Sequence, residues 1–151
     1  MTRRSCSKKR SLIFIDTSAL FAAFVSSDRN HRDARRAEEA LRTAHEQFWT
    51  IDAVLIELWL LLAKRAGLAA ADTTVRGLLE RGIEREPITS EDYARAWQIA
   101  REWPDQRFSL TDRQAFVVMD RTRRYGAWSY DDDFATIRLG PARRRAIDLV
   151  R

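Results

Sequence analysis

The chain has 151 residues, and 45% of them are hydrophobic, which is enough for one full core and too few for two large domains. Its 27 Lys and Arg residues outnumber its 22 Asp and Glu residues, and the net charge of +5 suits a polyanionic partner such as nucleic acid. One cysteine excludes an internal disulfide framework, and no segment approaches the roughly 18 apolar residues of a membrane span, so we expect a cytoplasmic protein without a membrane partner.

The first segment, residues 1–11, is basic and polar, and we interpret it as a flexible tail in front of one domain at 12–151. Leu12–Ile15 is short and wholly apolar, as expected of a buried central strand. Ser90 is the predicted N-cap of the helix that ends at Trp103. Further strands are predicted at 48–51, 87–89 and 127–130, and helices at 17–24, 31–47, 52–66, 71–84, 90–103 and 111–125.

Strands that alternate with helices predict parallel pairing, and therefore an α/β fold with a short central parallel sheet flanked by helices. Ligands of such folds bind at the carboxyl ends of the strands. Asp16 and Asp131 each follow a predicted strand directly, so both side chains are expected at that edge of the sheet.

Two more acidic residues join them as candidates. Glu57 lies in the middle of AVLIELWLLLA (53–63), where an unpaired charge would be costly unless it faces a polar pocket or a buried arginine. Asp112, in FSLTDRQAF, opens a predicted helix, where a carboxylate also compensates the helix dipole. Each acid alone therefore has a local explanation, including an N-cap role for Asp16 and a solvated turn for Asp131.

Four carboxylates at one edge of a sheet would repel one another, and a cation would neutralise them. Carboxylate oxygens suit Mg²⁺ or Mn²⁺, ions that activate water and stabilise a leaving oxygen during phosphodiester hydrolysis. The acidic residues together therefore predict a metal-dependent hydrolase.

The order IDTSAL, an apolar helix with a central Glu, SLTD at a helix start and YDDDF resembles the PIN-domain ribonucleases, above all the toxins of VapBC toxin–antitoxin pairs. The resemblance runs from about Leu12 to Leu139. It implies a metal-dependent endoribonuclease that uses Mg²⁺ or Mn²⁺ and leaves a 5′-phosphate and a 3′-hydroxyl. The catalytic quartet that it implies is Asp16, Glu57, Asp112 and Asp131, the first, third and fourth being metal ligands.

The same resemblance suggests supporting residues. Thr17 and Thr111 match hydroxyl neighbours of the first and third acids, and Asp133 competes with Asp131 for the fourth position because YDDDF offers three aspartates. Candidates for binding the RNA backbone are Arg113, Arg121 and Arg138. Candidates for stacking on RNA bases, with core packing as the alternative role, are Trp49, Trp97, Trp103 and Trp128.

The resemblance also implies a cognate antitoxin protein and a homodimer. The amphipathic helix predicted at 71–84 has two alternative interpretations: a surface for such a partner, or packing within the fold alone. The alternative is a non-catalytic RNA-binding or interaction module on the same fold. A phosphatase with a second aspartate two residues after Asp16 is disfavoured, because Ser18 stands there.

Overall fold

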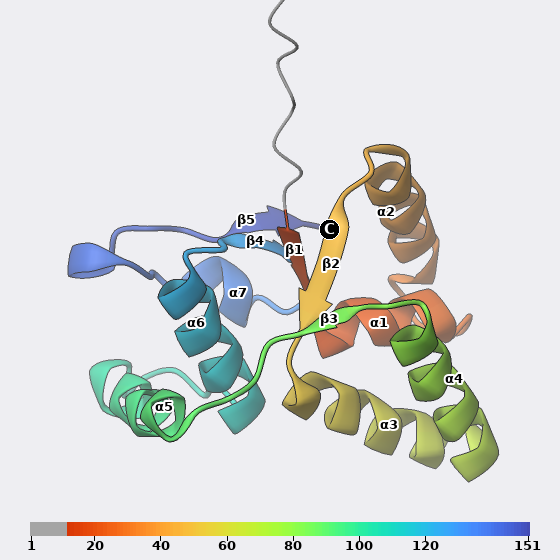
Figure 1. Cartoon of the computed structure of the whole chain (residues 1–151), viewed down its shortest axis with the longest axis horizontal. Coiled ribbons are helices and arrows are strands. Elements are labelled where there is room, and N and C mark those ends of the chain that lie inside the picture. The colour runs from red at the N-terminus through yellow and green to blue at the C-terminus, as the bar shows by residue number, and fades with distance from the viewer. Residues whose placement is uncertain (1–11) are drawn as a thin grey trace, which may run out of the picture.

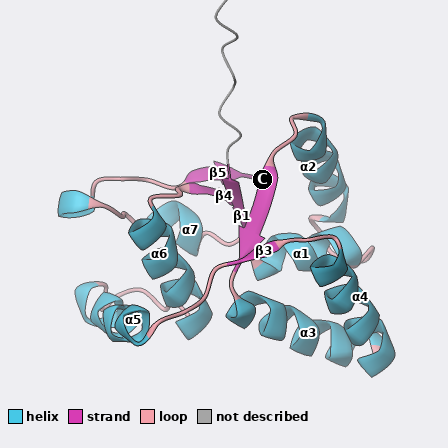
Figure 2. Cartoon of the chain, in the orientation of Figure 1, coloured by secondary structure: helices cyan, strands magenta, loops and turns pink. Residues whose placement is uncertain are grey.

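The computed structural model describes residues 12–151, so the basic tail expected over residues 1–11 lies outside the described residues. Five short parallel strands form a sheet in the middle of the molecule (Figures 1 and 2), in the order β3-β2-β1-β4-β5. The predicted α/β fold with a short central parallel sheet is confirmed. The strands are β1 (Leu12–Ile15), β2 (Gln47–Thr50), β3 (Glu84–Arg85), β4 (Gly126–Trp128) and β5 (Asp148–Val150).

The helices cover the sheet on two sides. In Figure 1, α5, α6 and α7 lie to the left of β1, whereas α1 to α4 lie below it and to its right. Helix α3 packs against α4, α5 against α6, and α1 against both α2 and α3. The helices are α1 (Thr17–Phe24), α2 (His31–Thr43), α3 (Asp52–Ala66), α4 (Leu68–Glu80), α5 (Ser90–Glu102), α6 (Leu110–Thr122) and α7 (Asp133–Thr136), with a 3-10 turn at Pro141–Arg143.

Strand β1 is apolar throughout because both faces of the sheet are covered. Phe14 is fully buried, and its ring lies 4.9 Å from that of Trp49 on β2 and 6.0 Å from that of Phe134 on α7. Phe134 in turn packs edge-on against Phe116 of α6, at 5.0 Å. These aromatic rings hold α7 and α6 over the end of the central strand.

The boundaries of α1 and α3 agree with prediction, whereas those of α2 and α4 differ. Helix α2 ends at Thr43 rather than at 47, because the chain turns at His45 (φ 56°) to enter β2. Helix α4 begins at Leu68, since Gly67 (φ 91°) redirects the chain from α3 without an intervening loop.

Two further predictions are wrong, and one strand was missed. The strand predicted at 87–89 is wrong: β3 lies at Glu84–Arg85 and pairs with Trp49 and Thr50, while Pro87 has no N–H to donate. The N-cap of α5 is Thr89 and not Ser90. Strand β5 escaped prediction because three residues are too few for a periodic pattern.

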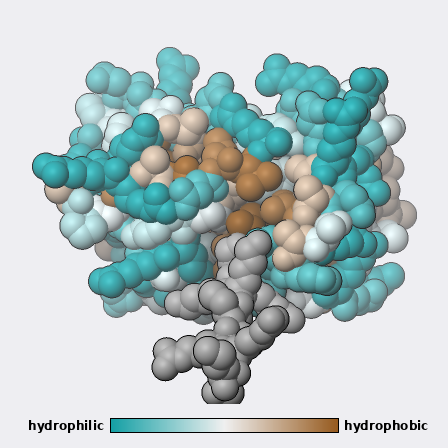
Figure 3. Space-filling view, turned by 90° about the horizontal axis from the view of Figure 1, so that it is seen from above, coloured by the Kyte–Doolittle hydropathy of each residue, from teal (hydrophilic) through white to brown (hydrophobic). Residues whose placement is uncertain are grey.

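The two edges of the sheet differ in character. Figure 3 shows the edge at which the strands begin, where a hydrophobic area lies among hydrophilic side chains. The opposite edge, where the strands end, carries the acidic residues predicted from the sequence.

Candidate active site

Asp16 sits where β1 ends and α1 begins. Its Oδ2 accepts a hydrogen bond from the backbone N–H of Ser18 at 3.2 Å, so it caps α1, and its own N–H donates to the Trp128 carbonyl at 3.1 Å. The side chain is only 4% exposed, and burial raises its pKa above the ordinary range, although hydrogen bonds from Ser18 and Ser129 act in the opposite direction. The capping role and the position at the strand edge therefore coexist in one residue.

Two serines join the ends of β1 and β4. The hydroxyls of Ser18 and Ser129 both donate to Asp16 Oδ2, at 2.6 and 2.9 Å. The Ser18 hydroxyl also accepts from the Tyr130 N–H at 2.9 Å, and that of Ser129 accepts from the Asp131 N–H at 3.0 Å. One pair of hydroxyls thus orients the first acid and the turn that carries the fourth.

Asp112 lies at the third helical position of α6, in a capping box with Ser109. The Ser109 N–H donates to Asp112 Oδ2 at 2.7 Å, and the Asp112 N–H donates to the Ser109 hydroxyl at 3.1 Å. Burial raises the pKa of Asp112 to about 7, and the negative charges of Asp16 and Asp131 contribute to this rise. Asp112 therefore serves the helix cap and also faces other carboxylates.

The turn after β4 brings two aspartates to Asp112. Strand β4 ends at Trp128, earlier than predicted, so Ser129 and not Asp131 follows the strand directly. The Asp133 N–H donates to Asp131 Oδ1 at 2.9 Å, and oxygens of Asp112, Asp131 and Asp133 lie within 4.8 Å of one another. Burial raises the pKa of Asp133, with the charge of Asp131 as the next cause. Both residues left open as the fourth acid are thus part of the cluster.

Glu57 approaches the same edge from α3. It is half-buried, and its Oε2 accepts a hydrogen bond of 2.6 Å from the Thr17 hydroxyl, on the residue next to Asp16. Within residues 12–151 no arginine pairs with it, so the buried ion pair considered from the sequence is not what the fold provides. Thr17 therefore couples α3 to the carboxylate cluster.

A family model for the PIN domain matches residues 13–138. The chain belongs to the PIN-domain family. It is 28% identical over 124 residues to VapC20 of Mycobacterium tuberculosis, a 23S rRNA-specific endonuclease, and the match covers 82% of this chain and 92% of VapC20. The crystal structure of that protein, described as a sarcin-ricin loop cleaving toxin, matches with a TM-score of 0.71 and 28% identity, over 80% of this chain and 91% of that one. The predicted family and the likeness to VapC toxins are confirmed.

The donor atoms of this PIN domain fit a hard divalent cation. Three carboxylates offer oxygens within 4.8 Å, the spacing allows them to share one ion, and the described residues add no sulfur or imidazole to the group. Oxygen-only ligands are typical of Mg²⁺ and Mn²⁺ sites. Burial first, and then the charges of Asp16 and Asp131, raise the pKa of Asp112, so a bound cation would favour its ionised form.

The three arginines predicted to bind RNA lie in different places. Arg121 occupies the far end of α6 from Asp112 and is held by Asp92 and Glu86, at 3.0 Å each. Arg138 donates from Nη1 to three carbonyls at the end of α7, the helix that begins at Asp133. Arg113 follows Asp112 directly in the sequence, and Thr111 precedes it. Both Thr111 and Arg113 are half-buried. The Arg113 guanidinium lies at the start of α6, where its Nε donates to the Ser109 carbonyl, and Arg121 lies in a separate ion-pair cluster.

Ser18 and Ser129 were not predicted as site residues. Their signal is weak in the sequence, since each is only a hydroxyl two residues away from an acid, after Asp16 and before Asp131. Such spacing is equally common in turns that serve no site.

None of the helices within residues 12–151 is long and apolar enough to span a membrane.

Proposed function

We propose that this PIN-domain protein is a metal-dependent endoribonuclease and the toxin of a toxin–antitoxin pair, the function of its relative VapC20 being cleavage of 23S rRNA. The observation that carries the proposal is the convergence of Asp112, Asp131 and Asp133 within 4.8 Å, beside the buried Asp16. With Glu57 of α3, which accepts from Thr17, four segments distant in the sequence contribute acids to one edge of the sheet. Helix capping alone does not require this arrangement.

Asp112, Asp131 and Asp133 would hold Mg²⁺ or Mn²⁺, with Asp16 as a further ligand. A bound divalent cation lowers the pKa of an attacking water and stabilises negative charge on the leaving oxygen. Glu57 is the proton acceptor: Thr17 fixes its Oε2 at 2.6 Å, and its other oxygen takes the proton of the water. Ser18 and Ser129 keep the Asp16 carboxylate in one orientation through their hydroxyls.

The experiment compares cleavage of a labelled, mostly single-stranded RNA with Mg²⁺, Mn²⁺ or EDTA, using the wild type and Asp16→Asn. We expect cleavage that needs a divalent ion and is lost in the variant, which is nearly isosteric. If neither protein cleaves RNA and Mn²⁺ leaves the melting temperature unchanged, the proposal fails and a non-catalytic binding module becomes the better description.

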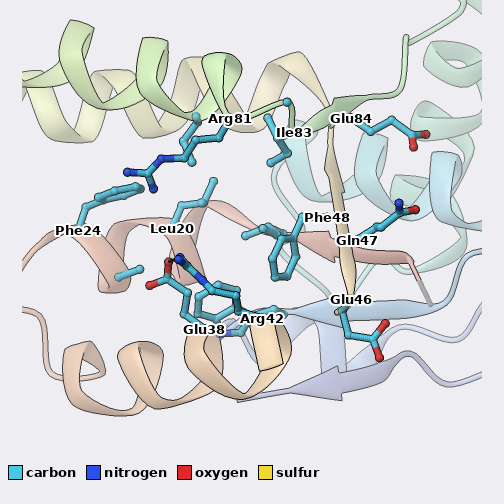
Figure 4. Close-up of a pocket in the computed structure, with 15 residues that line it drawn as sticks. Leu20, Phe24, Glu38, Arg42, Glu46, Gln47, Phe48, Arg81, Ile83 and Glu84 are labelled. Atoms are coloured by element: carbon cyan, nitrogen blue, oxygen red, sulfur yellow. Dashed lines mark hydrogen bonds and ion pairs between the residues drawn. The ribbon is translucent and has the colours of Figure 1, made fainter. Parts of the chain in front are cut away.

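An antitoxin is proposed as the protein partner, and one surface suits it. A pocket of about 390 Å³ opens between α1, α2, β2 and the end of α4 (Figure 4), away from the carboxylates. Leu20, Phe48 and Ile83 form apolar walls, and Glu38 pairs with Arg42 on the rim at 2.9 Å. Co-expression with the product of an adjacent small open reading frame should abolish RNA cleavage; unchanged cleavage by the co-purified proteins would contradict this role.

A homodimer is proposed on the exposed apolar side chains of α3 and α4. Ile56, Leu60 and Leu68 are 61%, 57% and 64% exposed, which is costly for a monomer in water. Leu60→Asp should halve the mass measured by light scattering, because a charge cannot be buried unpaired in an apolar interface. An unchanged mass would place the interface elsewhere.

A further inference from the structure

Helix α5 presents large aromatic side chains to solvent and packs against α6, the helix that carries Asp112. Trp97 is 47% exposed and Tyr93, one helical turn earlier, is 45% exposed. Two other tryptophans considered for base stacking, Trp49 and Trp128, are buried in the core at 0% and 2% exposure. The fold therefore leaves Trp97 available for a ligand and assigns those two to packing.

Arg113 connects this surface to the carboxylates. Its Cζ lies 5.3 Å from the centroid of the Trp97 ring, within the range of a cation–π contact, and its Nε donates to the Ser109 carbonyl at 3.2 Å. The backbone N–H of the same Ser109 donates to Asp112. One N-cap residue thus fixes both an acid of the cluster and the guanidinium that lies against Trp97.

Among the residues that the structure describes, no carboxylate forms an ion pair with the Arg113 guanidinium. Arg121 on the same helix, in contrast, is bound to Asp92 and Glu86. A cation kept free of carboxylates beside a phosphodiester-cleaving site suits a phosphate, and an exposed aromatic ring next to it suits a base.

We propose that Tyr93, Trp97 and Arg113 form a stacking platform that holds an unpaired base of the RNA next to the bond to be cleaved. This inference rests on the proposed function. The Trp97 ring stacks on the base, Arg113 contacts the adjoining phosphate, and Tyr93 extends the aromatic surface by one helical turn. Paired bases are not free to leave their stack, so the platform favours loops and single strands over duplex RNA.

The test measures RNA binding and not cleavage, in the full chain carrying Asp16→Asn. Fluorescence anisotropy with Mg²⁺ follows a labelled single-stranded RNA of about 12 nucleotides, together with a series in which one nucleotide at a time is abasic. Trp97→Ala should weaken binding of the intact RNA about tenfold, and Trp97→Phe by less than about threefold, because phenylalanine keeps an aromatic face. Gln98→Ala, which removes an exposed, uncharged side chain on α5, is the matched control and should bind as well as its parent.

The abasic series decides whether the effect is stacking. With Trp97 present, removal of the base at one position should weaken binding about tenfold; with Trp97→Ala, the same removal should cost less than about twofold, since the contact is already absent. Equal losses in both proteins, or unchanged binding of intact RNA by Trp97→Ala, would overturn the platform and leave the proposed nuclease standing.

Two further measurements separate other outcomes. If Trp97→Ala changes the mass by light scattering, or lowers the melting temperature by as much as a core substitution, the residue belongs to a protein interface or to the fold, and the platform is refuted. If no protein of the series binds RNA, including the parent, the proposed function itself fails and the platform with it.

Discussion

Helices α5 and α6 begin with the same local structure in opposite electrostatic surroundings. Each starts with a hydroxyl N-cap followed by an aspartate three residues later, in a reciprocal capping box: Thr89 with Asp92, and Ser109 with Asp112. Both aspartates are buried, at 3% and 8% exposure. From the four residues of each capping box alone, Asp92 and Asp112 would be assigned the same structural role.

What separates the two boxes is the partner that the tertiary fold supplies. Asp92 receives Arg121 from α6, with Nε at 3.0 Å and Nη2 at 3.1 Å, so its charge is neutralised by protein. Asp112 receives Asp131 and Asp133 instead, and burial raises its pKa to about 7. A carboxylate whose partner is a fixed arginine serves stability, whereas one among other carboxylates is suited to bind a cation.

The largest expected contrast is in catalysis. Asp112→Asn should lower RNA cleavage by about 10²- to 10⁴-fold, because it removes a charge on which the reaction depends, whereas Asp92→Asn should change the rate per folded molecule by less than about twofold. Initial rates at saturating Mg²⁺ measure both. Similar losses in the two variants would mean that the two capping boxes are functionally equivalent. The carboxylate surroundings of Asp112 would then have no special role in catalysis.

The second contrast is in the pH dependence of stability. The pKa of Asp112 rises from 3.8 to about 7 on folding, so the folded protein holds a proton that the unfolded chain has released, and stability is lost as pH rises from about 4 to 7. The Asp112→Asn variant does not lose stability in this way, because asparagine does not ionise. In EDTA at pH 8 we expect the variant to be more stable than the wild type by about 4 kcal/mol, with little difference near pH 4.

Urea denaturation at the two pH values measures this difference. Mg²⁺ or Mn²⁺ should raise the melting temperature of the wild type at pH 8 much more than at pH 5, because the ion competes with the proton for Asp112. A variant that is less stable than the wild type at pH 8 would show that the carboxylate is stabilised by partners other than those described.

The third expectation has the opposite sign. Asp92→Asn keeps an oxygen for the capping box but breaks the ion pair with Arg121, and should cost about 2 kcal/mol. This is less than for a fully buried pair, because the Arg121 side chain is 38% exposed. Chemical denaturation at pH 7 measures it, and equal stability of variant and wild type would make the ion pair energetically neutral.

The smallest expected effect concerns the Ser129 hydroxyl, which orients Asp16 and the turn at Asp131. Ser129→Ala removes a donor to Asp16 and an acceptor for the Asp131 N–H, and should lower cleavage about tenfold at fixed Mg²⁺. Part of this loss should be recovered at higher Mg²⁺ if the hydroxyl acts by positioning ligands. Thr89→Ser, which preserves the hydroxyl of the α5 box, is the control and should have no measurable effect on the rate.

The sequence by itself determined the elements and residues that depend on near neighbours. The apolar run of Leu12–Ile15 and the periodic patterns of Thr17–Phe24 and Asp52–Ala66 predicted β1, α1 and α3 with their observed bounds. The alternation of strands with helices predicted the parallel sheet, and the acids in order along the chain predicted the family. These features depend on hydrophobic period, caps and spacing, which are properties of adjacent residues.

The tertiary structure alone decided which partner each side chain meets. It placed Arg121 on Asp92 and aspartates on Asp112, and it buried Trp49 while exposing Trp97. It also fixed the position of β3 and added β5, whose two and three residues pair with a neighbouring strand. Contacts between residues far apart in sequence depend on how the elements pack. They therefore cannot be predicted from the sequence around either residue.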